Sequence, residues 1–134
     1  MKIGFTGTQG TMTVDQFDQL VTIVKGLGAT EAHHGDCIGS DAVFHDICVE
    51  LGIPVIIHPP EDPKKMAYCS GAHVVLAAKG YLDRNKDIVD ESDALIAVPN
   101  SMTEKMRSGT WSTYRYAVKQ DKIIFLILPN GAVR

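Results

Sequence analysis

Residues 84–113 of the chain read RNKDIVDESDALIAVPNSMTEKMRSGTWST. Residues 81–92 have a helical pattern, and residues 93–98 form an apolar run that ends at a proline. After a polar loop, Ser108, Gly109 and Thr110 stand where a second helix, to about residue 119, would begin. Because a helix, an apolar strand and another helix follow one another, this stretch indicates a parallel sheet that helices cover.

The same alternation extends from this stretch to both ends of the chain. A capping box, Thr13 with Gln16, predicts a helix that ends near Gly26, and Gly52 ends the next helical pattern. Residues 73–77 are a further extended piece. Strands are expected at residues 3–6, 30–34, 54–58, 93–98 and 123–128. We therefore predict an α/β, Rossmann-like doubly wound, mainly parallel five-stranded sheet with helices on both faces, in a single domain over residues 1–134.

Composition excludes several classes of protein. Of 134 residues, 45% are hydrophobic and 22% are charged, which is typical of a soluble globular protein. The net charge of −3, with scattered Lys and Arg, provides no basic surface for duplex DNA or an anionic membrane. No apolar run approaches the roughly 18 residues of a membrane span. We therefore expect neither a membrane nor a nucleic acid as partner.

The cysteines and the N-terminus indicate a cytoplasmic protein. Cys37, Cys48 and Cys69 are an odd number without a C-x-x-C pair, so a disulfide framework is not expected. Cys48 falls on the apolar face of a helix. The first residues lead directly into a strand and lack the apolar segment of a signal peptide.

Three loops rich in Gly, Ser and Thr predict a ligand site. Ligands of doubly wound sheets bind beyond the carboxyl ends of the strands, where the strand order switches. With the first strand central, residues 6–10, 35–41 and 99–110 would meet there. This convergence of three small-residue loops is the strongest physical indication of function in the sequence.

The first two of these loops allow two interpretations each. The Gly7–Gly10 loop either turns its amides toward a ligand or is an ordinary turn, and it matches neither G-x-G-x-x-G nor G-K-[ST]. The carboxylates of the second loop would accept hydrogen bonds from ribose, or Asp41 would serve the first turn of its helix. The predicted ligand-binding residues here are Gly7, Thr8, Gln9, Gly35, Asp36, Gly39 and Asp41.

The third loop would supply the anion site, because free amides and the positive dipole end of a helix favour an anion. Arg84 would grip a phosphate, or would pair on the surface with Asp83 or Asp87. Arg107 would add a contact or lie in solvent, and Trp111 would be a core residue or a platform for a flat ring. The predicted ligand-binding residues here are Arg84, Asn85, Pro99, Arg107, Ser108, Gly109 and Thr110.

The histidines do not form a compact metal-binding motif. His45 follows Asp41 by one helical turn, and the pair would need His33 or His34 as a further ligand. His33 and His34 are adjacent in a strand, so their side chains point to opposite faces of the sheet. We expect no metal and no cofactor.

Four segments carry a resemblance to a known group of proteins. They are TGT at 6–8, HHGDCIGSD at 33–41, YLDRNKDIVDESDALIAVP at 81–99 and RSGTWSTYRYA at 107–117. In this order they resemble the SLOG superfamily of Rossmann-like proteins over nearly the whole chain, and most of all its small stand-alone members related to YspA and YpsA. The superfamily includes DprA, the LOG phosphoribohydrolases and domains that sense nucleotide-derived signals. The resemblance implies a nucleotide-like ligand in the crevice and a homodimer or other homo-oligomer.

The resemblance to the LOG phosphoribohydrolases fails at the residue that their reaction needs. Arg84, Pro99 and Gly109-Thr110 match the family motif, but the position of its catalytic Glu is Thr113. A hydroxyl cannot replace a carboxylate that stabilises a ribosyl cation or acts as a general base. The motif's double glycine is Asn100-Ser101 here. We therefore identify no catalytic residue and favour binding over catalysis.

The sequence thus predicts a cytoplasmic protein that binds a nucleotide-derived small molecule, such as a nucleotide, an ADP-ribose-like compound or a cyclic nucleotide signal. In nucleotide signalling it would act as a sensor or as a sponge that sequesters the signal. The alternative is an N-glycosidase that acts on nucleoside monophosphates. Binding of single-stranded DNA, suggested by the R-N and S-G-S segments of DprA, is less favoured because the chain is acidic and poor in aromatic residues. A further alternative is a vestigial cleft in a protein that works through surface contacts.

Overall fold

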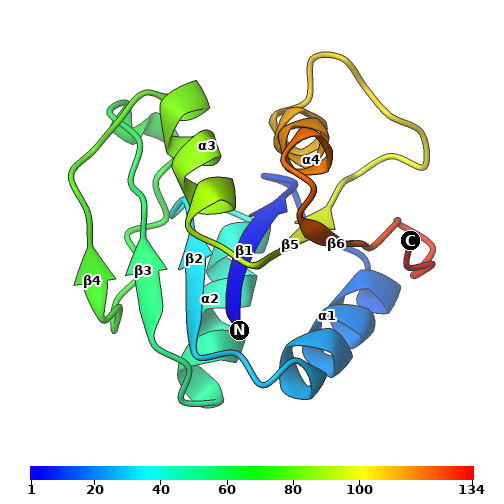
Figure 1. Ribbon diagram of the computed structural model, residues 1–134, viewed down its shortest axis with the longest axis horizontal. Helices are drawn as coiled ribbons and strands as arrows, with labels where there is room; N and C mark the ends of the chain where they lie inside the picture. The colour runs from blue at the N-terminus through cyan, green and yellow to red at the C-terminus, as the bar shows by residue number, and fades with distance from the viewer.

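The computed structural model describes residues 1–134 as a parallel sheet between two pairs of helices (Figure 1). The chain runs through β1 (Lys2–Gly7), α1 (Val14–Gly26), β2 (Glu31–His34), α2 (Ser40–Glu50), β3 (Val55–Ile57), a 3₁₀ turn (Pro63–Lys65), β4 (Val74–Val75), α3 (Tyr81–Asp90), β5 (Ala94–Val98), α4 (Gly109–Lys119) and β6 (Ile123–Leu126). No helix is both long and apolar enough to cross a membrane.

The sheet confirms the predicted fold class and adds one strand. The strand order is β4-β3-β2-β1-β5-β6, and all neighbouring strands are parallel. The prediction of five strands was wrong because β4, in the segment expected only to be extended, pairs with β3 through Ile56 and Val74. This edge strand is only two residues long and both are exposed, so the apolar residues of this segment do not form a buried strand like the others.

The helices divide between the two faces of the sheet, with α1 and α2 on one face and α3 and α4 on the other (Figure 1). On the first face, Ile3 and Phe5 of β1 pack with Leu20 of α1 and Phe44 of α2 in the largest apolar cluster. On the other face, Gly4 lets α3 approach closely, since a Cβ there would lie 2.7 Å from the Ser92 hydroxyl. Alternate residues of the central strand therefore serve two different cores.

The predicted capping box of α1 is present, and it also connects this helix to the sheet. The Thr13 hydroxyl accepts from the Gln16 amide, and the Gln16 side chain accepts from the Thr13 amide, each at 3.0 Å. The same Gln16 side chain is buried and donates to the carbonyls of Pro99 at 2.7 Å and Ile127 at 3.0 Å. One glutamine thus satisfies the ends of β5 and β6 as well as the helix.

The strand order brings the three predicted loops to one edge of the sheet. Since β1 lies between β2 and β5, the chain leaves β1 toward one side of the sheet and returns to its other side for β5. The loops after these strands diverge, which opens a crevice at the carboxyl edge. The loops after β1, β2 and β5 all face this crevice.

Gly39 provides a test of how closely two of these loops must approach. Its φ of 83° lies in the left-handed region, and a Cβ there would clash with the carbonyls of Gln9 and Gly10. We predict that Gly39→Ala lowers the free energy of unfolding by about 2 kcal/mol or more. The matched control is Gly26→Ala, at a helical site with no atom near the new Cβ, which should stabilise by about 0.5 kcal/mol. Urea unfolding measures both, and equal effects would contradict the close approach.

Candidate functional site

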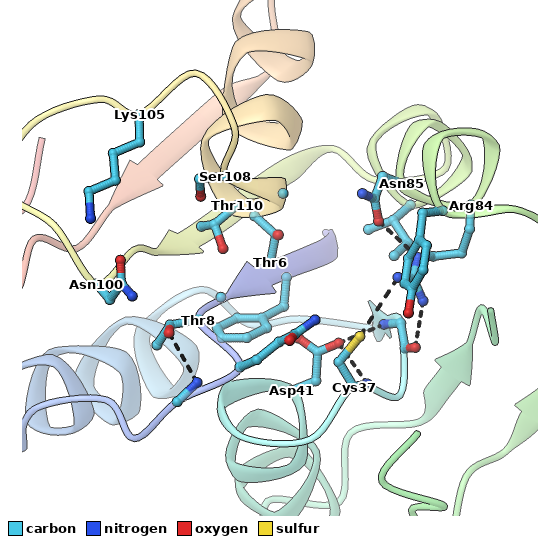
Figure 2. A pocket seen from close by; sticks show the side chains of 18 of the residues that line it. Thr6, Thr8, Cys37, Asp41, Arg84, Asn85, Asn100, Lys105, Ser108 and Thr110 are labelled. Carbon is cyan, nitrogen blue, oxygen red and sulfur yellow. Dashed lines mark hydrogen bonds between the residues drawn. The ribbon is translucent and has the colours of Figure 1, made fainter. Parts of the chain in front are cut away.

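A cavity of about 550 Å³ lies at the carboxyl edge of the sheet, and 19 residues line it. Figure 2 shows Arg84 and Asn85 on one side of it, Asn100 and Lys105 on the other, and Ser108 and Thr110 at the start of α4. The lining residues are Phe5, Thr6, Gly7, Thr8, Gln9, Gly10, Gly35, Cys37, Asp41, Tyr81, Arg84, Asn85, Ile88, Asn100, Lys105, Arg107, Ser108, Gly109 and Thr110. The three predicted loops therefore converge.

Most predicted site residues line this cavity, but Asp36, Gly39 and Pro99 do not. Asp36 has a φ of 55° and its carboxylate accepts from the Cys69 amide at 2.9 Å, so it holds two loops together. Gly39 packs against the first loop, and the Pro99 carbonyl accepts from Gln16. These three residues have structural contacts that the local sequence does not reveal.

Several lining residues were missed by sequence reasoning. Thr6 follows Gly4 by two positions in β1, so strand alternation was a usable signal for its orientation. Tyr81 begins the helix that carries Arg84 and lies one turn before it. Lys105 lies in an irregular loop, where no periodicity places a side chain. Phe5 and Ile88 lie outside the three predicted loops, whereas Gly10, Cys37 and Asn100 lie within them but were not among the predicted binding residues.

Arg84 is buried in the wall of the cavity, with only 4% of its surface exposed. Its Nη1 donates to the carbonyls of Gly35 at 2.6 Å and His58 at 3.1 Å, and its Nε donates to Asn85 at 2.8 Å. The alternative of a surface pair with Asp87 is wrong, because that carboxylate pairs with Lys79. Arg84 has no carboxylate within salt-bridge distance.

The guanidinium of Arg84 therefore keeps donor capacity for a ligand. Of its five N–H groups, the two on Nη2 contact only the Cys37 sulfur, at 3.7 Å, which is a weak acceptor. The ring of Tyr81 lies 5.2 Å from the guanidinium carbon and stabilises the cation without using a donor. A buried cation at a cavity wall, with only a weak sulfur acceptor at its Nη2, favours an anionic ligand.

The start of α4 faces the same cavity as Arg84. Ser108 caps the helix, with its hydroxyl accepting from the Trp111 amide at 3.3 Å. The amides of Gly109 and Thr110, in the first turn, have no acceptor within the helix. Both residues line the cavity, so their amides and the positive dipole end add to the anion site.

Charge in the cavity is predominantly positive, although the chain is acidic overall. Arg84, Lys105 and Arg107 line it together with one carboxylate, Asp41. Asp41 accepts from the amides of Gly35 at 3.2 Å and Cys37 at 3.1 Å, which lie in the loop before α2, so it does not serve the first turn of its helix as the alternative had it. Burial raises the pKa of Asp41 to about 6, against the opposing effect of these amides and of Arg84.

The first loop does not present the row of amides that its glycines suggested. The Thr8 amide donates to the Val98 carbonyl at 2.9 Å, and the Gly10 amide donates to the Thr8 hydroxyl at 3.1 Å. The loop contributes the polar side chains of Thr6, Thr8 and Gln9 to the lining instead. The groups of this cavity that are suited to contact an anion are therefore Arg84 and the start of α4.

Trp111 is a core residue, as one of the two alternatives had it. Its ring packs edge-on to Tyr114, with centroids 5.4 Å apart, and its indole N–H donates to Ser101 at 2.9 Å. The ring is 4% exposed, so it offers no platform to a ligand. The aromatic surface of the cavity comes from Tyr81 and Phe5.

The histidines lie outside the cavity. His33 and His34 point to opposite faces of the sheet, as their adjacency predicted, and neither lines the cavity. His45 bonds to His34 and not to Asp41, so the Asp41–His45 metal pair considered from the sequence does not form. Within the cavity, the side chains of a type that can coordinate a metal are Cys37 and Asp41.

Comparisons with known proteins agree with this fold. No protein-family model and no curated protein matches the sequence. The chain is similar to the molybdenum cofactor binding protein of the phototrophic bacterium Rippkaea orientalis, with a TM-score of 0.72 and 20% identity over 95% of this chain and 76% of that one. It is also similar to TM1055, a structural genomics target, with a TM-score of 0.64 and 16% identity over 92% and 71% of the two chains.

A third solved structure, the single-stranded DNA-binding DNA processing protein A of Helicobacter pylori, has a TM-score of 0.67 and 21% identity over 94% of this chain and 64% of that one. The three likenesses show a Rossmann-like α/β protein. They are consistent with a SLOG-type fold, because DNA processing protein A is among the proteins that the sequence resembles. Membership of the group related to YspA and YpsA stays a prediction.

The pKa values of three buried groups predict how stability depends on pH. The pKa of Asp41 is about 6 in the folded protein and 3.8 in the unfolded chain. Between pH 4 and 6, therefore, the Asp41 carboxyl is protonated in the folded protein and ionised in the unfolded chain. This contribution to stability is lost as the pH rises to about 6. Burial lowers the pKa of His34 to about 3 and that of His58 to about 4, so these groups add stability as the pH rises toward 6.5.

We predict that Asp41→Asn makes stability rise more steeply between pH 4 and 6 than in the wild type. The added slope should be about 1.4 kcal/mol per pH unit, because the Asp41 proton, which opposes the effect of the two histidines on stability, is removed. Urea unfolding at several pH values measures it. Parallel curves for the two proteins would contradict the raised pKa of Asp41.

Proposed function

We propose that the protein binds the phosphate group of a nucleotide-derived small molecule in the cavity at the carboxyl edge of the sheet. The observation that carries this proposal is Arg84, a buried guanidinium at the cavity wall without a carboxylate partner. Leaving a buried charge without a counter-ion costs several kcal/mol by the order of magnitude of such penalties. A bound phosphate would supply the counter-charge.

The remainder of the cavity suits the rest of such a ligand. Its volume of about 550 Å³ falls in the range of roughly 300–1,000 Å³ of small-molecule sites. Beside it, a second hollow shares Tyr81, Asn85 and Arg107 with the cavity and extends to Lys64 and Lys65. A flat ring would lie against Tyr81 while hydroxyl groups of a ribose meet the polar side chains of the first loop.

The burial and hydrogen bonding of Thr113 favour binding without cleavage. This side chain, at the position of the phosphoribohydrolase Glu, is buried in α4 and donates to the Gly109 carbonyl at 2.9 Å. Asp41, the one carboxylate of the cavity lining, is hydrogen-bonded to its own loop. We therefore propose a sensor or a sequestering protein rather than an N-glycosidase.

Self-association is part of this proposal. Beside the outer end of the cavity, Leu82 and Met106 are 68% and 82% exposed, and they would be covered if a second copy of the chain packed there. Light scattering coupled to size exclusion would measure the oligomer. A protein that is monomeric at all concentrations would contradict the proposed self-association but would not affect the proposed ligand site.

Calorimetry against a panel of nucleoside monophosphates, ADP-ribose and cyclic nucleotides tests the function. We predict a binder whose affinity falls about tenfold or more in Arg107→Ala, because one charge-assisted contact contributes roughly 1.5–3 kcal/mol. Arg134→Ala is the matched control, since Arg134 is exposed and does not line the cavity. Its affinity should stay within about twofold of the wild type.

Two outcomes would contradict the proposal. The first is that no member of the panel binds, and the second is that Arg107→Ala and Arg134→Ala weaken binding equally. Chromatography of the ligand after incubation distinguishes binding from catalysis. Intact ligand supports the proposal, whereas free base that increases with protein concentration would establish an N-glycosidase.

A further inference from the structure

A cluster of two histidines and two glutamates lies on the α3 face of the sheet, apart from the cavity. His33 Nδ1 lies 2.8 Å from His58 Nε2, and both side chains are almost fully buried. Glu91 Oε2 lies 3.3 Å from that His58 nitrogen and 3.8 Å from the His33 nitrogen. On the far side of the His33 ring, Glu31 contacts Nε2 at 2.6 Å.

The hydrogen bonds of the cluster fix where the protons are. The Glu31 carboxylate accepts from His33 Nε2, so in the neutral ring the lone pair is on Nδ1. This lone pair faces His58 Nε2, whose proton lies between the two rings. His33 Nδ1, His58 Nε2 and the Glu91 carboxylate oxygen therefore converge on one position, which a single shared proton now occupies.

We propose that His33 Nδ1, His58 Nε2 and the Glu91 carboxylate bind a divalent cation of the Zn²⁺ class. Two nitrogens on one tetrahedral Zn²⁺, each at about 2.0–2.1 Å, lie about 3.3 Å apart, so the rings must separate by about half an ångström. The Glu91 oxygen is already at that spacing from His58. For His58 to bind the cation, the single proton of its neutral ring moves from Nε2 to Nδ1 by exchange with water, which leaves the Nε2 lone pair for the metal.

Glu31 and Glu91 have different parts in this site. Glu31 holds the His33 ring through Nε2, as carboxylates do for metal-bound histidines, and raises the basicity of Nδ1. Glu91 provides the negative charge beside the cation. Together the two carboxylates match the charge of a divalent ion between two neutral imidazoles.

A second cluster, His34 with His45 and Cys69, shows why proximity alone does not make a metal site. The Asp36 amide donates to His34 Nδ1 at 2.9 Å, so the proton of that ring is on Nε2, which faces His45. The other nitrogen of His45 bonds to the Ser70 carbonyl at 2.6 Å. A cation on His34 Nε2 would force a proton onto Nδ1 against the Asp36 N–H.

The proposed site would connect α3 to the sheet. Glu91 is the C-terminal cap residue of α3, whereas His33 belongs to β2 and His58 follows β3. Glu31, His33 and Glu91 also line a surface hollow, from which a cation would enter. With three protein ligands, the fourth coordination position belongs to water or to a substrate, as in sites with two histidines and one glutamate.

Calorimetric titration of ZnCl₂ into the chelator-treated full chain tests the site. We expect one Zn²⁺ per chain, with affinity about 10- to 100-fold weaker in Glu31→Gln and at least as much weaker in Glu91→Gln. Glu91 is 52% exposed, so its replacement leaves the fold intact. Asp90→Asn, an exposed carboxylate beside the same hollow, and Cys69→Ala should both bind as the wild type does.

Co²⁺ gives an independent readout of the ligand set. A cobalt spectrum with tetrahedral visible bands and no thiolate charge-transfer band supports two nitrogens and a carboxylate. Absence of Zn²⁺ binding, a thiolate band, or binding lost in Cys69→Ala but kept in Glu91→Gln would overturn the proposal. None of these results depends on the nucleotide panel, because no metal ligand lines the cavity.

Discussion

The structure of the site depends on the hydrogen bonds that fix the Arg84 guanidinium to the carbonyls of Gly35 and His58. These bonds join α3 to the ends of β2 and β3, so the wall of the cavity cannot form without them. The contact also explains the glycine at position 35, since a Cβ there would clash with the guanidinium. The carbonyls that hold this cation engage its Nη1, so its Nη2 donors are left for the anionic ligand that we propose.

A local positive field inside an acidic protein follows from the same arrangement. The net charge of −3 argues against a polyanionic partner such as DNA, but it does not describe a cavity that collects three cationic side chains. Asp41 is the exception within the lining, and its burial favours the neutral acid. The positive charge of the cavity is therefore concentrated at one wall and at one helix start, which is the basis of the proposed preference for a small anion.

The sequence predicted what local patterns determine and missed what distant contacts determine. Apolar runs and the Thr13 capping box predicted α1 and every strand except β4, because these signals lie within a few residues. Asp36 was misread because its partner, the Cys69 amide, is 33 positions away. The convergence of the loops was predictable from the strand order, but which amides were already satisfied within the first loop was not.

The helix α3 carries both proposed sites, with Arg84 at its start and Glu91 at its end, and His58 contacts both through its carbonyl and its ring. The central claim concerns the first of them. An NMR titration of the labelled protein with ADP-ribose, and separately with inorganic phosphate, follows the Arg84 Nε–H resonance directly. We predict that it shifts together with the amides of Gly109 and Thr110 along one binding curve. Saturation by either ligand with the Arg84 resonance unmoved would contradict the account.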